Sequence, residues 1–161
     1  STVADMLKDR LKCKNILIKN NSEYVMEVCE KVFGWNPDLE GKSERVRRLF
    51  REITHTGYNF DNYFWEKKTL EKVRPYIANL DYLIVPDWRY KCTHDFWKEL
   101  GYEIFTIKVE RPHFDNGYDE EVKKDDIGYL KDIYFDLYVF NTGTLENLEE
   151  IVDDGINMMG W

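Results

Sequence analysis

The sequence predicts an α/β fold in which short buried strands alternate with amphipathic helices. Apolar runs of strand length occur at 16–18, 82–85 and 136–140. Between them, apolar residues recur at the three- and four-residue spacing of helices. Strands that alternate with helices form a parallel sheet with helices on both faces. The chain has 161 residues, the size of one ordinary domain, so we expect a single domain over 1–161.

The first half of the chain is expected to consist mainly of helices around one strand. We predict a helix over 1–12, a strand over 15–19, and a helix over 22–33 that ends at Gly34. The segment 36–41 is predicted to be a loop. Ser43 then caps a further helix, and another helix runs from near Asp61 toward Val73, with Pro75 as a stop or kink.

The second half continues the alternation of strands and helices. We expect a strand over 82–85, a helix over 93–100 closed by Gly101, and a strand over 102–109. The polar segment 113–130 is predicted to be a mobile lid. A last strand over 136–140 and a closing helix over 144–156 follow.

Composition narrows the class of protein. A formal net charge of -8 argues against a partner that is a nucleic-acid polymer, because such binding requires a basic excess. The three cysteines favour neither a disulfide framework nor a zinc site, and they fit a reducing cytoplasm. No apolar stretch approaches the roughly 20 residues that a membrane span requires. We therefore predict a cytoplasmic protein with no membrane partner.

The end of the strand over 82–85 is the most informative segment. The strand ends in Pro86-Asp87-Trp88-Arg89-Tyr90, so a carboxylate and a guanidinium follow it directly. Open α/β sheets bind ligands at the carboxyl edge of their strands. Asp87 is suited to a metal ion or its water, and Arg89 to a phosphate. The alternative is that these two residues only cap a helix and form a surface ion pair.

Other polar groups favour phosphate chemistry over that alternative. Arg111 follows the strand over 102–109, and Asn141-Thr142 follows the last strand. Arg47 and Arg51 are four residues apart and share a helix face, so together they can receive a phosphate. Each arginine of this helix is, taken singly, more typical of a solvated face. Gly41-Lys42-Ser43 lacks the earlier glycine and the strand that a phosphate-binding loop requires.

Five short motifs occur in order over most of residues 43–150. They are Arg47-Arg48-Leu49, Phe60-Asp61 with Tyr63 and Trp65, Val85-Pro86-Asp87-Trp88-Arg89, Val109-Glu110-Arg111-Pro112, and Asn141-Thr142-Gly143-Thr144-Leu145 with Leu148. This ordered set resembles the phage-type deoxynucleoside monophosphate kinases, a branch of the P-loop kinases.

The resemblance implies a P-loop-kinase-like parallel sheet and transfer of the terminal phosphoryl group of ATP, with Mg²⁺, to a deoxynucleoside monophosphate (dNMP). It assigns Asp87 to magnesium or acceptor orientation, and Arg89 and Arg47 to the acceptor and transferred phosphates. It places the acceptor near Arg48, Arg51, Asp61 and Trp65. The donor nucleotide is assigned to Ser1, Thr2, Arg111, Asn141 and Thr142, with Ser1 as a magnesium ligand.

The resemblance also implies a segment before Ser1. Ser1-Thr2-Val3-Ala4-Asp5 is similar to the residues that follow the Gly-Lys of the family's phosphate-binding loop. We therefore expect about 10–15 preceding residues that end in Gly-Lys. Tyr24 and Met26 depart from the proline and lysine that the family often has there.

Two other functions remain open at this point. One is a nucleotide- or protein-binding module of the same fold without turnover, and the other is a kinase of a different small metabolite. A homodimer is possible under each of them, as is the cytoplasm of a host cell if the protein is viral.

Overall fold

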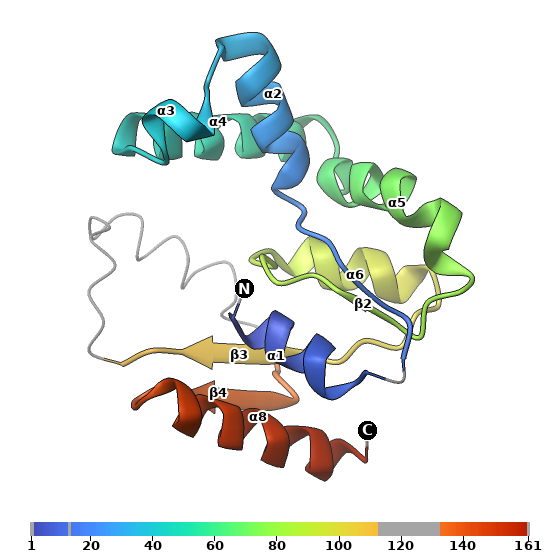
Figure 1. The fold of residues 1–161 in the computed structure, drawn as a ribbon. Helices are drawn as coiled ribbons and strands as arrows, with labels where there is room; N and C mark the ends of the chain where they lie inside the picture. Colours follow the sequence, from blue (N-terminus) through green and yellow to red (C-terminus); the bar gives the residue numbers. More distant parts are fainter. Residues whose placement is uncertain (1, 13, 113–132, 161) are drawn as a thin grey trace. The chain divides into compact units, whose positions relative to one another are not determined.

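A computed structural model describes residues 2–12, 14–112 and 133–160 (Figure 1). The predicted lid over 113–130 and Ser1 lie outside the described residues. The chain divides into two compact units: unit 1 is Ser1–Ile16 with Arg89–Trp161, and unit 2 is Leu17–Trp88. Two such units can belong to one domain, so the single-domain prediction remains a prediction.

Unit 2 contains helices and a short pair of strands. Its helices are α2 (Glu23–Phe33), α3 (Pro37–Glu40), α4 (Glu44–Phe60) and α5 (Phe64–Ile77). Strand β1 (Ile16–Ile18), which starts at the boundary of the unit, pairs with β2 (Tyr82–Ile84) in a two-stranded sheet. Helix α2 ends at Gly34 in the left-handed conformation, with φ of 67°. Glycine adopts that conformation without strain, which confirms the predicted stop.

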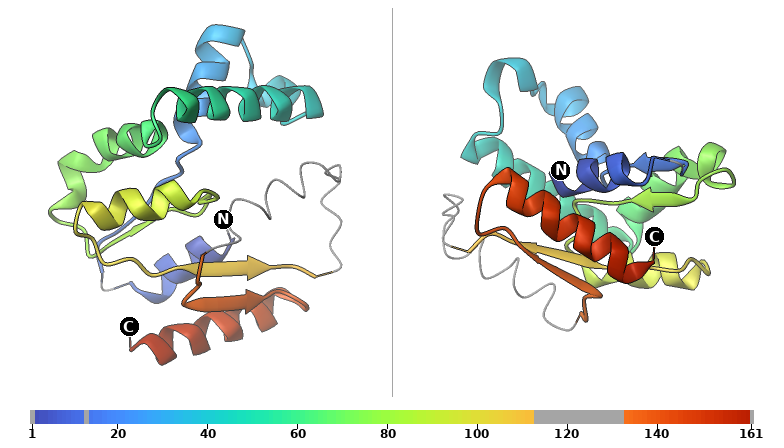
Figure 2. Two further views of the ribbon diagram at one scale, coloured as in Figure 1. Left: turned by 180° about the vertical axis from the view of Figure 1, so that it is seen from behind. Right: turned by 60° about the horizontal axis from the view of Figure 1, so that its bottom comes forward.

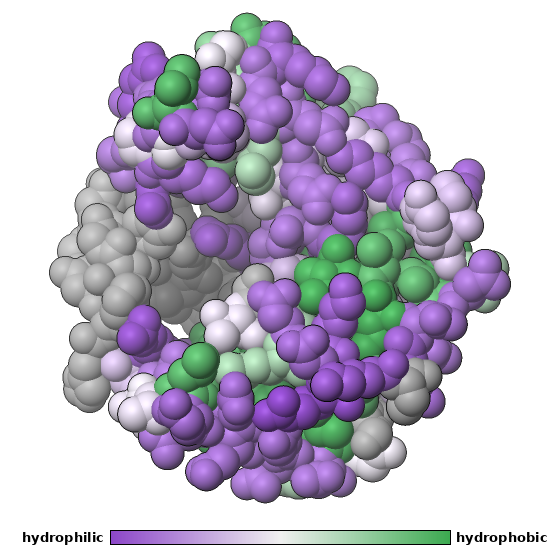
Figure 3. Space-filling model, viewed as in Figure 1, coloured by the Kyte–Doolittle hydropathy of each residue, from purple (hydrophilic) through white to green (hydrophobic). Residues whose placement is uncertain are grey.

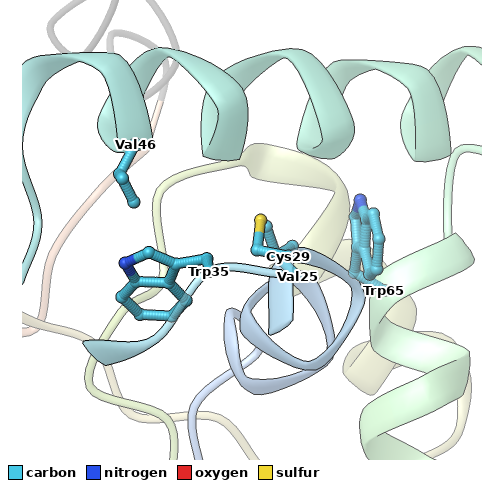
Figure 4. Close-up of a cluster of buried hydrophobic side chains, with 5 residues drawn as sticks. All are labelled: Val25, Cys29, Trp35, Val46 and Trp65. Atoms are coloured by element: carbon cyan, nitrogen blue, oxygen red, sulfur yellow. The ribbon is translucent and has the colours of Figure 1, made fainter. Parts of the chain in front are cut away.

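The core of unit 2 joins three helices through aromatic and small side chains. Val25 and Cys29 of α2 lie between Val46 of α4 and Trp65 of α5, with Trp35 beside them (Figure 4). All five side chains are buried. The Trp35 ring meets Phe50 edge to face at a centroid distance of 5.0 Å. These contacts position α4 and α5, which carry most of the predicted acceptor residues.

Unit 1 is built on a parallel pair of strands. Strand β3 (Ile107–Glu110) pairs in parallel with β4 (Leu137–Phe140), with Ile107 opposite Leu137 and Glu110 opposite Phe140. Helix α8 (Leu145–Met159) packs on β4 and on α1 (Thr2–Arg10) (Figure 2). The unit also contains α6 (Lys91–Glu99).

The order of helices and strands confirms the predicted order over the described residues, with three local differences. The predicted loop over 36–41 contains α3, because Asn36 accepts from the Asp38 N–H as an N-cap and Pro37 is at the first helical position. Helix α5 continues two residues past Pro75. Strand β3 begins at Ile107, five residues later than predicted.

The observed strand pairing differs from the predicted parallel sheet with helices on both faces. Over the described residues the strands form two two-stranded sheets, β1 with β2 and β3 with β4, and no larger sheet. The described residues therefore form a mixed fold of helices and short strand pairs. The α/β prediction is confirmed in its mixture of helices and strands, but a large parallel sheet is not observed over these residues. None of the described helices is long and apolar enough to cross a bilayer.

Candidate functional site

Asp87 holds the turn that leads into α2. Its Oδ1 atom accepts the backbone N–H of Asn21 at 2.9 Å, and its Oδ2 atom accepts that of Ser22 at 2.8 Å. Ser22 is the N-cap of α2 but makes no capping hydrogen bond through its own side chain. A carboxylate is favoured at a helix N-terminus by the helix dipole. Asp87 therefore caps a helix, which was the alternative to a ligand-binding role. The helix that it caps begins 65 residues away in sequence.

The four arginines of α4 have local partners. Arg45 pairs with Glu40 at 3.1 Å, Arg48 with Glu52 at 3.0 Å, and Arg51 with Glu44 at 2.9 Å. Arg47 donates its Nε–H to the carbonyl of Lys42 at 2.9 Å. Hydrophilic side chains dominate this side of α3 and α4 (Figure 3). Exposed ion pairs contribute little free energy, so the guanidinium groups of Arg45, Arg48 and Arg51 can exchange carboxylates for phosphate oxygens at little cost.

Asp61 connects the end of α4 to α5. Its side chain accepts the backbone N–H of Tyr63 at 2.9 Å and the ammonium group of Lys67 at 2.5 Å. The Lys67 hydrogen bond, followed by that of the Tyr63 N–H, lowers the pKa of the Asp61 carboxyl group. Asp61 is thus an ionised group at the junction of two helices, and its predicted role in acceptor binding remains a prediction.

Trp65 is part of the core of unit 2. Only 5 % of the residue is exposed, and its indole N–H donates to the carbonyl of Thr54 at 2.9 Å. Its ring meets Phe64 edge to face, with centroids 4.8 Å apart. Gly57 of α4 lies so close to this ring that an added Cβ atom would be 2.5 Å from it. The structure therefore gives Trp65 a packing role, and stacking on a base is not needed to explain it.

Glu66 is a buried ionisable residue that the sequence interpretation missed. It is fully buried, and its Oε1 atom accepts the hydroxyl of Tyr58 at 2.8 Å. Ionisable groups are rarely buried without compensating hydrogen bonds. The sequence contains one signal for this burial. Glu66, Thr69 and Val73 recur at helical spacing, so they share one face of α5, and this face is the buried one.

Arg111 and Asn141 follow neighbouring strands in unit 1. Because Glu110 pairs with Phe140 in a parallel register, the next residues of both strands leave the same edge of the sheet. The backbone N–H of Asn141 donates to the carbonyl of Glu110 at 2.7 Å, which extends the ladder by one bond. Arg111 and Thr142 are exposed, and Asn141 is half-buried. This is the carboxyl edge at which α/β sheets hold ligands.

The remaining predicted residues also fall in unit 1. Arg89 is exposed at the start of the segment Arg89–Trp161. Thr2 is exposed at the first position of α1. Ser1, predicted as a magnesium ligand and ATP contact, is outside the described residues.

The two units separate the predicted residues by their expected substrate. The acceptor-side residues Arg47, Arg48, Arg51, Asp61, Trp65 and Asp87 all belong to unit 2. The described donor-side residues Thr2, Arg111, Asn141 and Thr142 all belong to unit 1. Arg89 is the exception, since it is expected to hold phosphate and belongs to unit 1.

The predicted magnesium can be compared with the carboxylates that the structure describes. Among the described residues, no group of three or more His, Cys, Asp or Glu side chains is suited to hold a metal ion. Mg²⁺ usually keeps several waters and takes one or two carboxylates together with substrate phosphates. Asp87 fits that mode, because each carboxylate oxygen has a second lone pair besides the one that accepts an amide.

Comparison with protein-family models finds no match, and comparison with curated proteins finds none either.

Proposed function

We propose that the chain belongs to a deoxynucleoside monophosphate kinase that transfers the terminal phosphoryl group of ATP to a dNMP. The observation that carries the proposal is the common edge at which Arg111 and Asn141 follow two parallel, paired strands. A guanidinium, an amide and a hydroxyl at such an edge suit an anionic nucleotide with hydrogen-bonding groups on its base. The finer fold that we propose is the P-loop-kinase-like parallel sheet with helices on both faces.

The acceptor side of the proposal rests on unit 2. The arginines of α4 make exposed local contacts, and Arg47 and Arg51 are one helical turn apart. A monophosphate carries two negative charges near neutral pH, so two guanidinium groups on one face match it. Asp87 lies at the end of β2 in the same unit.

The reaction requires positioning and charge neutralisation more than covalent catalysis. An oxygen of the dNMP phosphate forms a bond to the γ-phosphorus of ATP, and the bond from that phosphorus to the β,γ-bridging oxygen breaks. The products are ADP and a deoxynucleoside diphosphate. Magnesium, when bound with ATP, neutralises charge on the β- and γ-phosphates. Arg47 and Arg89 then hold the acceptor and transferred phosphates.

Binding and turnover are tested separately. We expect calorimetry to detect ATP and at least one dNMP, and a coupled assay to detect ADP release that depends on the dNMP. Release of ADP at the same rate without any dNMP would contradict the proposal, as would absence of heat with every dNMP.

Arg89→Ala tests one assigned side chain, with Arg74→Ala as a matched control. Both arginines are exposed, and Arg74 lies on α5 outside the resembling motifs. We expect Arg89→Ala to abolish phosphoryl transfer with a nearly unchanged Tm, because an exposed arginine contributes little to folding. Arg74→Ala should retain activity. A large loss of Tm in Arg89→Ala would instead indicate a structural ion pair.

The second candidate is a binding module without turnover. It is favoured by Asp87, whose two oxygens already accept backbone amides and thus have a structural role without any metal. Heat of binding with a dNMP but no ADP release would support this candidate over the kinase.

A further inference from the structure

A hydrogen-bond network in unit 2 connects the end of β2, the start of α2 and the middle of α5. Asp87 accepts the amides of Asn21 and Ser22 through its two carboxylate oxygens. The Oδ1 atom of Asn21 accepts the hydroxyl of Thr69 at 2.8 Å. We call these three side chains the Thr69–Asn21–Asp87 network.

The hydrogen bond between Thr69 and Asn21 is shielded from water, whereas Asp87 is half-buried. Thr69 is 1 % exposed and Asn21 is 8 % exposed, so their hydrogen bond has little competition from solvent. Nearby, the Lys19 amide donates to the Ile84 carbonyl at 2.9 Å and continues the pairing of β1 with β2. A buried polar group that loses its partner costs more than an exposed one, because no water replaces the bond.

The two helices joined by the network contact α4, which carries the acceptor arginines of the proposed function. Helix α5 contains Trp65 and Thr69, one turn apart on its buried face. Helix α2 packs on both α4 and α5. A shift of the first turn of α2 therefore changes the packing of the helix that carries Arg47 and Arg51.

We propose that Thr69, Asn21 and Asp87 are positioning residues, which fix the first turn of α2 against α5 and thereby the acceptor-binding helices. This inference rests on the proposed function for its acceptor, a dNMP. It gives Asp87 a role that acts through backbone amides rather than through the reacting atoms.

Substitutions with nearly unchanged shape test the network. Asp87→Asn keeps one acceptor oxygen and replaces the other by an NH₂ donor, so one of the two amides loses its acceptor. Thr69→Val removes only the hydroxyl group, and Thr69→Ser restores it. Val73→Ala is the control, because Val73 is fully buried one turn further along α5 and is not part of the network.

Two readouts separate positioning from general stability. Amide hydrogen exchange at Asn21 and Ser22 reports the turn itself, and calorimetry with a dNMP reports the acceptor site. We expect Asp87→Asn and Thr69→Val to lower protection at these amides and to weaken dNMP binding by about three- to tenfold. Thr69→Ser should behave like the wild type. Val73→Ala should lower the Tm at least as much while leaving both readouts near wild type.

Failure of the proposed network and failure of the proposed function give different results. Unchanged protection at both amides in Asp87→Asn would overturn the network, and so would dNMP affinity that falls equally in Val73→Ala and Thr69→Val. If the wild type binds no dNMP, the proposed function fails. The exchange comparison then decides by itself whether the network fixes α2.

Discussion

Unit 2 and unit 1 hold their candidate residues by different means. In unit 2 the turn before α2 depends on a side chain, because the Asp87 carboxylate supplies both acceptors for the amides of Asn21 and Ser22. In unit 1 the edge that carries Arg111 and Asn141 is fixed by backbone pairing of β3 with β4. The hydrogen bonds of a backbone ladder use main-chain groups that every residue except proline supplies in full. Single substitutions should therefore disturb the geometry of unit 2 more readily than that of unit 1.

The largest effect is expected from the core of unit 2. Trp65→Ala removes a buried ring from between α4 and α5 and leaves a cavity, which we expect to destabilise the fold by about 3–5 kcal/mol. Guanidinium unfolding followed by circular dichroism measures the change. Phe60→Ala is the control, because this side chain is 82 % exposed and its loss should change stability by less than about 0.5 kcal/mol. Equal effects would contradict the packing role of Trp65.

Two glycines make a matched comparison between the units. A Cβ atom at Gly57 would lie 2.5 Å from the rigid ring of Trp65, and one at Gly155 would lie 2.7 Å from a flexible methyl group of Leu137. We expect Gly57→Ala to destabilise by about 1–3 kcal/mol. Gly155→Ala should cost less, because Leu137 can change rotamer, whereas the gain of about 1 kcal/mol of helix propensity is common to both variants, since both glycines lie inside helices. Unfolding curves that rank the two variants in the opposite order would reject this difference.

The smallest effect is expected on the thermal stability at acid pH. The Lys67 hydrogen bond lowers the pKa of Asp61 in unit 2, and the Lys91 hydrogen bond lowers that of Asp95 in unit 1. A lowered folded-state pKa stabilises the fold above the unfolded pKa, and the contribution is lost as pH falls through the folded value. A variant that lacks either carboxyl group should therefore lose less Tm than the wild type when the pH falls below about 4.

Asp61→Asn and Asp95→Asn compare the two carboxyl groups directly. Asp61 joins the end of α4 to α5, whereas Asp95 pairs with Lys91 inside one helix. We expect the smaller loss of Tm in Asp61→Asn, measured between pH 7 and pH 2. Identical profiles for wild type and Asp61→Asn would show that this pair contributes nothing to acid stability.

Local signals explain why most helices and strands were predictable. Gly34 ends α2, Ser43 caps α4, and Thr144 caps α8 through a reciprocal bond with Asn147. Each signal lies within a few residues of the boundary that it sets. Helix α3 was missed because Asn36-Pro37 is as typical of a loop as of a helix start.

Long-range features of the site were not predictable in the same way. The sequence placed Asp87 at a strand end, but nothing near it indicates that its partners are the amides of Asn21 and Ser22. The helical phase of Glu66 indicates its burial, but nothing near it indicates that its partner is the Tyr58 hydroxyl of another helix. By contrast, Arg111 and Asn141 were expected at strand ends, and the parallel register of β3 with β4 brings their backbones to one edge of that strand pair.

The division of the chain also has a consequence for the order of folding. Unit 2 is one continuous segment, whereas unit 1 combines residues from both ends of the chain. Arg10 of α1 pairs with Asp153 of α8 at 2.5 Å, across a sequence separation of 143 residues. During synthesis unit 2 can therefore close as soon as residue 88 leaves the ribosome, while α1 must wait until α8 has been made. A truncated nascent chain should acquire protease resistance in unit 2 first.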